Sequence, residues 1–116
     1  MKANNGRHCY ISGPISNIEN FNREAFKAAA DQYRSLGYDV YDPIEQDQAK
    51  GVNSKDCVVG GKSRALVLKK DCEYICDFLP LLVMLPGWRQ STGAFMEHSL
   101  GKALGLRIKY KRNGKK

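Results

Sequence analysis

The sequence predicts a single α/β domain built on a parallel β-sheet of four to five strands flanked by helices. Short apolar runs alternate along the chain with segments of helical periodicity, which is the pattern of parallel strands joined by helices. Residues 81–85 read LLVML and are continuously apolar, as expected for a strand that is covered on both faces. The 116 residues suffice for one core and show no internal repeat. We therefore expect one domain over 1–116 with a Rossmann-like or flavodoxin-like arrangement.

The first part of the chain is predicted to form two strands and one helix. Residues 8–12 read HCYIS and run into a Gly-Pro turn signal, which predicts a buried strand. Helical periodicity extends over 21–36, and Gly37 ends it. The residues expected on the buried side of this helix are Phe26, Ala29, Ala30, Tyr33 and Leu36. A second short strand is predicted over 38–43, where a proline closes the run YDVYDP.

The second part is predicted to form a loop and then two helices and two strands. The polar, glycine-bearing segment 44–62 is expected to be a mobile loop, because structureless connections of this length are usually lids, binding loops or disordered segments. A helix is predicted over 63–79, followed by the strand 81–85, a helix over 91–104 and a last strand over 106–110. The residues expected to be buried are Leu68, Cys72, Ile75 and Leu79 in the first of these helices, and Met96, Leu100 and Ala103 in the second.

The charge of the chain favours acidic partners without identifying one. The net charge is +7, and the residues from Lys102 onward include seven cations and no acid. This basic tail, which ends in 111–116, suits a phosphate-bearing ligand or nucleic acid, and it equally suits a solvated end that aids solubility. No run of aromatic residues among these charges suggests a base-stacking platform, so nucleic acid is not the expected partner.

The N-terminal residues and the cysteines favour a cytoplasmic protein with free thiols. No apolar run reaches the ~18 residues of a membrane span, and the first residues lack the apolar region of a signal peptide. Thiols in the cytoplasm stay reduced. Cys72 and Cys76 lie one helical turn apart, but no second pair completes a zinc site. We therefore expect neither a metal nor a cofactor.

Two polar segments follow predicted strands at their carboxyl ends, where parallel sheets bind their ligands. After the first strand, the residues SGPIS (12–16) offer backbone amides and serine hydroxyls that suit a phosphate. After the strand 81–85, the chain reads PGWRQSTGAFME. Ser91 in this run is a good helix N-cap, and the amides that follow an N-cap favour anions.

The same run places Gly93 four residues before Glu97, so both lie on one face of the predicted helix. A ligand that packs against the bare backbone at Gly93 would touch the Glu97 carboxylate. The spacing fits equally well a helix whose glycines approach the sheet while Glu97 is solvated. Asp71, on the preceding helix, is likewise either a site residue or one of the many solvated helix aspartates.

Two nucleotide-binding motifs are absent. The run GGKS (60–63) resembles the end of a phosphate-binding P-loop, but Asp56 stands where that motif needs a glycine. The fingerprint G-x-G-x-x-G of dinucleotide-binding folds does not occur either. These motifs therefore support neither an NTPase nor a dinucleotide-binding protein of the usual kind.

Two longer stretches resemble the nucleoside 2-deoxyribosyltransferase superfamily. They read YISGPISNIENFNREAFKAAADQYRSLGYDVYDP and KDCEYICDFLPLLVMLPGWRQSTGAFMEHSLGKALG. The likeness is strongest to small, often phage-encoded members with the signature LPGW…S.GA..E. The superfamily also includes the Rcl-type N-glycosidases, which act on deoxynucleoside 5′-monophosphates. The segment 44–62 and the basic tail lie outside the resemblance, and Pro80 stands where relatives often have an aspartate.

The resemblance implies a role for each matching residue. Glu97 corresponds to the nucleophile, Asp71 to the acid beside the leaving base, and Tyr10 to the tyrosine that orients the glutamate. The residues that would lie next to the sugar and its 5′ substituent are Ser12, Gly13, Pro14 and Ile15. Ser91 and Gly93 correspond to residues that hold a 5′-phosphate.

From this resemblance we expect an enzyme that hydrolyses the bond between base and sugar in a deoxynucleoside 5′-monophosphate. The same residues would serve a transferase that exchanges bases between deoxynucleosides. A non-catalytic nucleotide-binding protein is the alternative from another class, and a small nucleic-acid-binding protein would depend on the basic tail alone. The resemblance also implies a homodimer or larger homo-oligomer, acting in the host cytoplasm if the protein is phage-encoded.

Overall fold

The computed structural model describes residues 7–14, 22–44 and 61–112, without the side chains of 61–67. Its four strands are β1 (His8–Ser12), β2 (Asp39–Tyr41), β3 (Leu81–Met84) and β4 (Ile108–Tyr110). Its helices are α1 (Arg23–Ser35), α4 (Gly61–Phe78) and α5 (Thr92–Leu104), with a short 3₁₀ turn, η2 (Trp88–Gln90). The sheet has the order β2-β1-β3-β4, and every pair of neighbouring strands is parallel. The predicted parallel α/β fold is confirmed.

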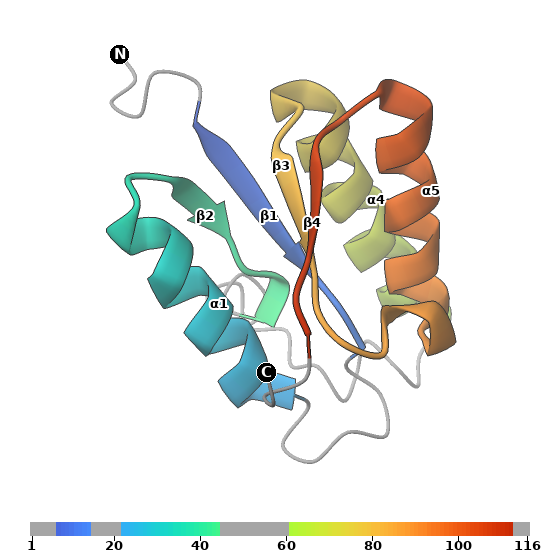
Figure 1. Ribbon diagram of the computed structural model, residues 1–116. Helices are drawn as coiled ribbons and strands as arrows, with labels where there is room; N and C mark the ends of the chain where they lie inside the picture. The colour runs from blue at the N-terminus through green and yellow to red at the C-terminus, as the bar shows by residue number, and fades with distance from the viewer. Residues whose placement is uncertain (1–6, 15–21, 45–60, 113–116) are drawn as a thin grey trace.

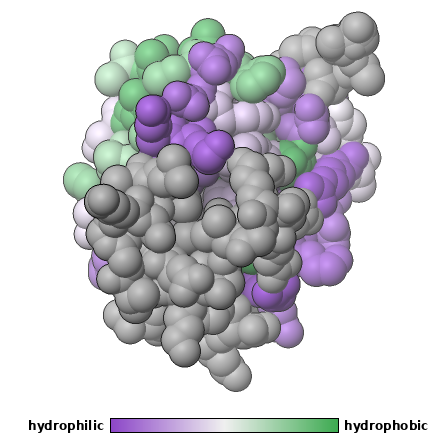
Figure 2. Space-filling view, turned by 180° about the vertical axis from the view of Figure 1, so that it is seen from behind, coloured by the Kyte–Doolittle hydropathy of each residue, from purple (hydrophilic) through white to green (hydrophobic). Residues whose placement is uncertain are grey.

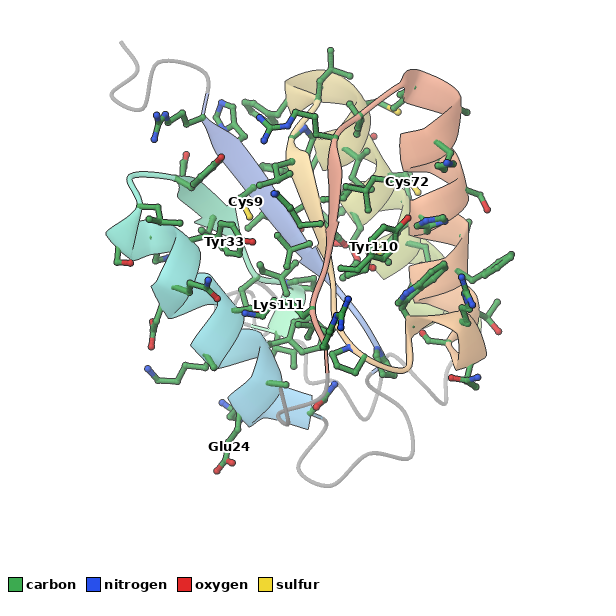
Figure 3. All side chains as sticks on the ribbon, in the orientation of Figure 1. Cys9, Glu24, Tyr33, Cys72, Tyr110 and Lys111 are labelled. Carbon is green, nitrogen blue, oxygen red and sulfur yellow. The ribbon has the colours of Figure 1, made fainter. Side chains whose placement is uncertain are left out.

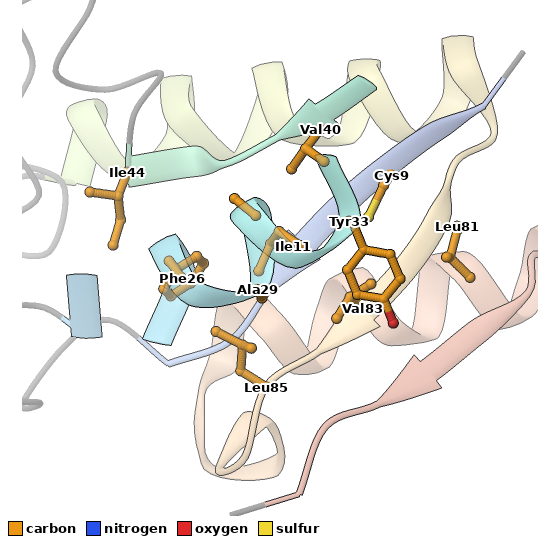
Figure 4. Packing of buried hydrophobic residues seen from close by; sticks show 11 residues of the cluster. Cys9, Ile11, Phe26, Ala29, Tyr33, Val40, Ile44, Leu81, Val83 and Leu85 are labelled. Carbon is orange, nitrogen blue, oxygen red and sulfur yellow. The ribbon is translucent and has the colours of Figure 1, made fainter. Parts of the chain in front are cut away.

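The helices cover both faces of the sheet, with α1 on one face and α4 and α5 on the other (Figure 1). Alternate residues of β1 serve the two faces, as the strand's period of two requires. Cys9 and Ile11 join the apolar cluster around α1, seen from close by in Figure 4, whereas Tyr10 belongs to the cluster beneath α4 and α5. The central strand therefore contributes to two separate cores.

The order of the strands places a topological switch point between β1 and β3. The chain leaves β1 toward β2 on one side and leaves β3 toward β4 on the other, so the two connections diverge at the carboxyl ends. Ser12 and Met84, the last residues of these strands, are paired in register. The Leu85 amide also donates to the Ser12 carbonyl at 2.8 Å. A crevice at this place is where open parallel sheets bind ligands.

The helix ends agree closely with the local sequence signals. The Ser91 hydroxyl accepts a hydrogen bond from the Ala94 amide at 3.2 Å, so Ser91 is the N-cap of α5. Gly37 follows α1 and Gly105 follows α5, both with positive φ, which glycine adopts most readily. Helix α4 begins at Gly61, two residues before the predicted start. The rest of the predicted loop, 45–60, lies outside the described residues.

The predicted buried faces of the helices are partly wrong. Leu36, Leu79 and Met96 are exposed instead of buried, and so is Ala103. The residues of α5 that are buried are Ala94, Glu97 and Gly101. The reason lies at Gly101, where a Cβ atom would come within 2.3 Å of the Leu82 side chain. Only a glycine lets α5 approach β3 so closely, and this contact turns Glu97 toward the sheet.

Several large apolar side chains remain at the surface. In the space-filling view from behind, apolar (green) surface gathers at the upper left and lies directly beside hydrophilic (purple) surface (Figure 2).

Within the described part of the chain, no helix combines the length and the apolar character needed to cross a membrane.

Candidate active site

The candidate site is centred on a buried glutamate that two hydroxyl groups hold in place. The Ser12 hydroxyl donates a hydrogen bond to Glu97 Oε1 at 2.6 Å, and the Tyr10 hydroxyl donates to Glu97 Oε2 at 2.8 Å. Glu97 is only 5 % exposed, and Tyr10 and Ser12 are also buried. Both oxygens of the carboxylate therefore have a fixed partner, and the group has a defined orientation.

This contact follows from the geometry of β1 and α5. Tyr10 and Ser12 are two residues apart on one strand, so their side chains leave the same face of the sheet. Glu97 lies near the middle of α5, one helical turn before Gly101, and the close approach at Gly101 directs that face toward the sheet. The interpretation of Glu97 as a solvated residue is therefore wrong, while the interpretation of the glycines as a packing device is correct for Gly101.

A second buried acid lies on the neighbouring helix. Asp71 of α4 is 5 % exposed, so it too is not a solvated helix aspartate. The Tyr41 hydroxyl donates to Asp71 Oδ1 at 3.1 Å, and the Tyr41 ring stacks on Tyr10 with a centroid distance of 5.2 Å. Tyr10 and Tyr41 are register partners on β1 and β2. The stacked rings of Tyr10 and Tyr41 therefore link the two acids, because Tyr10 holds Glu97 and Tyr41 holds Asp71.

Tyr41 is a site residue that the sequence analysis did not single out. The signal was present, because a parallel pairing of HCYIS with the short run DVY places the two tyrosines opposite each other. Register between strands distant in the sequence is not readable from one chain, however, so the pairing became visible only in the structure.

Burial controls the protonation of the site. Burial first, and the negative charge of Asp71 second, raise the pKa of the Glu97 carboxyl to about 8. The hydrogen bonds from Ser12 and Tyr10 act in the opposite direction, because they favour the ionised form. Burial, followed by the nearby charge of Glu97, also raises the pKa of Tyr10 well above its usual range, so its phenol remains a donor. The protonation of Glu97 therefore depends on the charge of Asp71.

A family model described as a domain of unknown function, DUF4406, matches residues 7–110. The chain belongs to the DUF4406 family. No curated protein and no solved structure matches the chain.

The structure brings four of the predicted site residues of this DUF4406 domain together: Tyr10, Ser12, Asp71 and Glu97. Ser12 contacts the glutamate itself, although the resemblance had implied a place beside the sugar. Ser91 caps α5 a turn and a half before Glu97. A Cβ atom at Gly93 would find its nearest neighbour, Leu68, at 3.6 Å, which is an ordinary contact, so Gly93 is not required for packing as Gly101 is.

The loop after β1 has a structural role that the sequence analysis did not predict. A Cβ atom at Gly13 would lie 2.7 Å from the Leu85 side chain, so only glycine allows the ends of β1 and β3 to meet. The Pro14 carbonyl accepts a hydrogen bond from the Asn22 side chain at 2.9 Å, which ties the loop to the start of α1. Ile15, the fourth predicted residue of this loop, lies outside the described residues.

Other parts of the DUF4406 domain offer less chemistry. Within 7–14, 22–44 and 61–112, no group of three or more His, Cys, Asp or Glu side chains is placed to hold a metal ion. A cavity of about 400 Å³ lies at the opposite, amino-terminal edge of the sheet, among Arg7, His8, Leu81 and Arg107. Arg7 there donates to the Leu36 carbonyl at the end of α1. This cavity has no carboxylate in its lining, so we place the candidate site at the two acids.

The chemistry available to these two acids is proton transfer combined with nucleophilic attack. Two neighbouring buried carboxyl groups do not readily ionise together, so the pair tends to hold one proton between them. One member can then act as an acid while the other, ionised and fixed by two donors, acts as a base or nucleophile. Perturbed, coupled acids of this kind are typical of functional sites.

Proposed function

We propose that this protein is an N-glycosidase that hydrolyses the bond between base and sugar in a (deoxy)nucleoside 5′-monophosphate. The observation that carries the proposal is the Glu97 carboxylate, which is buried, held by Tyr10 and Ser12, and coupled to Asp71. Burial of an acid costs folding free energy, because its charged form loses the solvation of water. A protein that accepts this cost is expected to use the acid in its function. The resemblance to nucleoside 2-deoxyribosyltransferases supplies the reaction that needs such an acid.

The first step breaks the C1′–N bond. Positive charge develops at C1′ as the base departs, and Glu97 forms a C1′–O bond as the nucleophile. Asp71 transfers its proton to the departing base, which would leave poorly as an anion. Below about pH 8 the pair's proton lies on Glu97 in the unliganded protein, so it must move to Asp71 before the bond breaks. In the reacting state the proton is then used at the base, and the ionised member lies at the sugar.

The second step restores the enzyme. Water attacks C1′, the C1′–O bond to Glu97 breaks, and the water proton passes to Asp71. The products are the free base and the sugar 5′-phosphate. A second base in place of water would give base exchange, which is the related transferase reaction. Tyr10 and Ser12 serve in both steps, because they hold the carboxylate oxygens as the charge leaves and returns.

The preference for a phosphorylated substrate is supported by the start of α5. A helix N-terminus presents free amides and a partial positive charge, and both favour a phosphate. Ser91 uses its hydroxyl oxygen as an acceptor for the Ala94 amide, so its own proton remains available to an anion. Gly93 follows in the first turn, where its lack of a side chain leaves room beside the helix.

The test is to incubate the protein with a panel of ribo- and deoxynucleosides and their 5′-monophosphates, and to separate the products by chromatography. We expect free base and sugar phosphate from at least one monophosphate, and no release by the Glu97→Gln variant. A parallel reaction with a second free base separates the two enzymatic outcomes, because a transferase would incorporate that base. A protein that binds monophosphates but releases base from none of them would be a non-catalytic nucleotide-binding protein, and the proposal would be wrong.

A further inference from the structure

The outer side of α5 and the edge strand β4 carry a cluster of rings that the candidate active site does not use. Trp88 of η2 stacks on His98 with a centroid distance of 4.1 Å and lies nearly parallel to Phe95 at 6.1 Å. Tyr110 of β4 completes the cluster at 5.9 Å from Trp88, and its hydroxyl pairs with His98 Nε2 at 2.7 Å. We call Trp88, Phe95, His98 and Tyr110 the aromatic face.

Two rings of the aromatic face are half open to solvent. Phe95 is 51 % exposed and Tyr110 is 52 % exposed, whereas Trp88 also packs against the core cluster beneath α5. Figure 3 shows Tyr110 turned toward α5 and its neighbour Lys111 turned toward α1, as alternation along a strand requires. The exposed rings are therefore held in place by Trp88 and His98, and each leaves part of its surface free.

Two cations, Arg89 and Lys102, lie near the aromatic face. The Arg89 guanidinium lies 5.1 Å from the centre of the Trp88 ring. The pKa of His98 is lowered by partial burial and then by the charges of Lys102 and Arg89, so both cations act at this face. Between residues 79 and 112 the chain has a single acid, Glu97, and that acid is buried. The cations of the same stretch are Arg89, Lys102, Arg107, Lys109, Lys111 and Arg112.

We propose that the aromatic face binds single-stranded nucleic acid, with bases stacked on Phe95 and Tyr110 and phosphates near Arg89 and Lys102. Exposed rings among cations are the two components of such surfaces, because every base has a face that stacks and every nucleotide has a charge. This binding site would be separate from the glutamate site and does not depend on the proposed glycosidase activity. The rings come from η2, α5 and β4, and only the fold brings them side by side, which is why the sequence analysis found no stacking platform.

A second copy of the chain is a less suitable occupant. Two copies that met through this face would bring its cations together with no exposed acid of residues 79–112 to neutralise them. A polyanion neutralises them instead. The same charges also suit an anionic membrane, but a lipid headgroup has no ring to stack on Phe95 and Tyr110.

The test measures binding of fluorescein-labelled oligo(dT) by fluorescence anisotropy at several salt concentrations. Stacking contributes about 1–3 kcal/mol per base, so Phe95→Ala and Tyr110→Ala should each weaken binding by at least about five-fold. Phe78→Ala is the matched control, because Phe78 is 48 % exposed but lies at the far end of α4. Arg89→Gln should weaken binding and reduce its salt dependence, whereas Arg23→Gln on α1, on the opposite face of the sheet, should do neither.

A second probe separates stacking from charge alone. An abasic deoxyribose-phosphate oligomer of the same length should bind more weakly than oligo(dT) and should not respond to Phe95→Ala. Equal losses with the two oligomers, or an equal loss for Phe78→Ala, would overturn the proposal, as would no binding at low salt. Sedimentation of the same variants covers the remaining alternative: a parent dimer that Phe95→Ala dissociates would assign the face to a second copy. Base release from mononucleotides should be the same in the parent and in both aromatic variants.

Discussion

The two faces of the sheet differ sharply, although the same strands build both. The face beneath α1 is an apolar cluster that includes Cys9 and Ile11, whereas the face beneath α4 and α5 buries Tyr10, Ser12 and two acids. Apolar burial stabilises the fold by ~25 cal/mol per Å². A buried carboxylate does the opposite unless it is neutralised or hydrogen-bonded. Both faces contribute apolar burial, but the face beneath α4 and α5 combines its apolar cluster with the two acids of the candidate site. We call this second face the chemical face.

The largest expected effect comes from a comparison of one substitution on each face of the sheet. Glu97→Gln keeps the size of the side chain but removes the proposed nucleophile, so base release should fall by more than about a thousand-fold. Ile11→Val on the α1 face should cost ~1 kcal/mol of folding free energy and leave turnover unchanged. Turnover is measured by base release and stability by urea unfolding. Near-parental turnover by the Glu97→Gln variant would show that Glu97 is not the nucleophile. The proposed functional difference between the two faces would then also be wrong.

The Glu97→Gln variant also tests how the buried acid affects the stability of the fold. The folded protein holds the Glu97 proton up to about pH 8, whereas the unfolded chain releases it near the ordinary value of 4.5. The free energy of unfolding should therefore decrease as the pH rises through this window, by up to about 1.4 kcal/mol per pH unit. Because Glu97→Gln cannot titrate, its unfolding free energy should depend less on pH than that of the parent.

Local signals predicted much of the fold but not the orientation of α5. Strand β1 and the glycines that follow α1 and α5 were predictable, because each depends on residues near it in the sequence. The apolar pattern placed Met96 and Ala103 on the buried face of α5, but the space between the helix and Leu82 admits only Gly101. The helix is turned accordingly, and Glu97 becomes buried. That requirement comes from β3, so it is absent from the helix pattern itself.

Most residues of the candidate site were predictable from the sequence, but Tyr41 and the contacts between the residues were not. Glu97, Asp71 and Tyr10 came from the resemblance, and the structure brings them together. The bond from Ser12 to Glu97 joins residues 85 positions apart, and the bond from Tyr41 of β2 to Asp71 of α4 joins residues 30 positions apart. Contacts of this kind depend on strand register and helix rotation, neither of which is a local property of the sequence.

The second-largest effect concerns the other acid of the chemical face. Asp71→Asn retains the shape of the side chain but cannot donate a proton to the base, so the rate should fall by ~10²–10⁴ while substrate affinity changes little. The pH–rate profile of this variant should lose its alkaline limb, because that limb reports the loss of the acid's proton. Steady-state kinetics over a pH series measure both. An unchanged rate with weaker binding would mean that Asp71 only holds the base.

Ser91 tests how far the chemical face extends along α5. If the hydroxyl also donates to a 5′-phosphate, Ser91→Ala should cost about ten- to a hundred-fold in kcat/KM on monophosphates and much less on nucleosides. The loss of the cap to Ala94 should by itself cost ~1 kcal/mol of stability. Ser91→Thr, which retains a capping hydroxyl, is the matched control. Equal losses on both substrates would restrict Ser91 to capping.

The smallest expected effect lies in the two hydroxyls that distinguish the chemical face from the apolar one. Ser12 and Tyr10 favour the ionised form of Glu97, so Ser12→Ala or Tyr10→Phe should raise the pKa of that carboxyl above about 8. In the proposed reaction the nucleophile is the ionised form, so the rate should rise with pH, and this acid limb should move to higher pH in both variants. We expect a loss of about ten-fold at pH 7, the worth of a hydrogen bond to a charged group, and recovery of most of it at alkaline pH. Tyr41→Phe, which removes a hydroxyl bound to Asp71 instead, should leave the acid limb in place. A loss that stays the same at every pH would mean that the hydroxyls position Glu97 without controlling its charge.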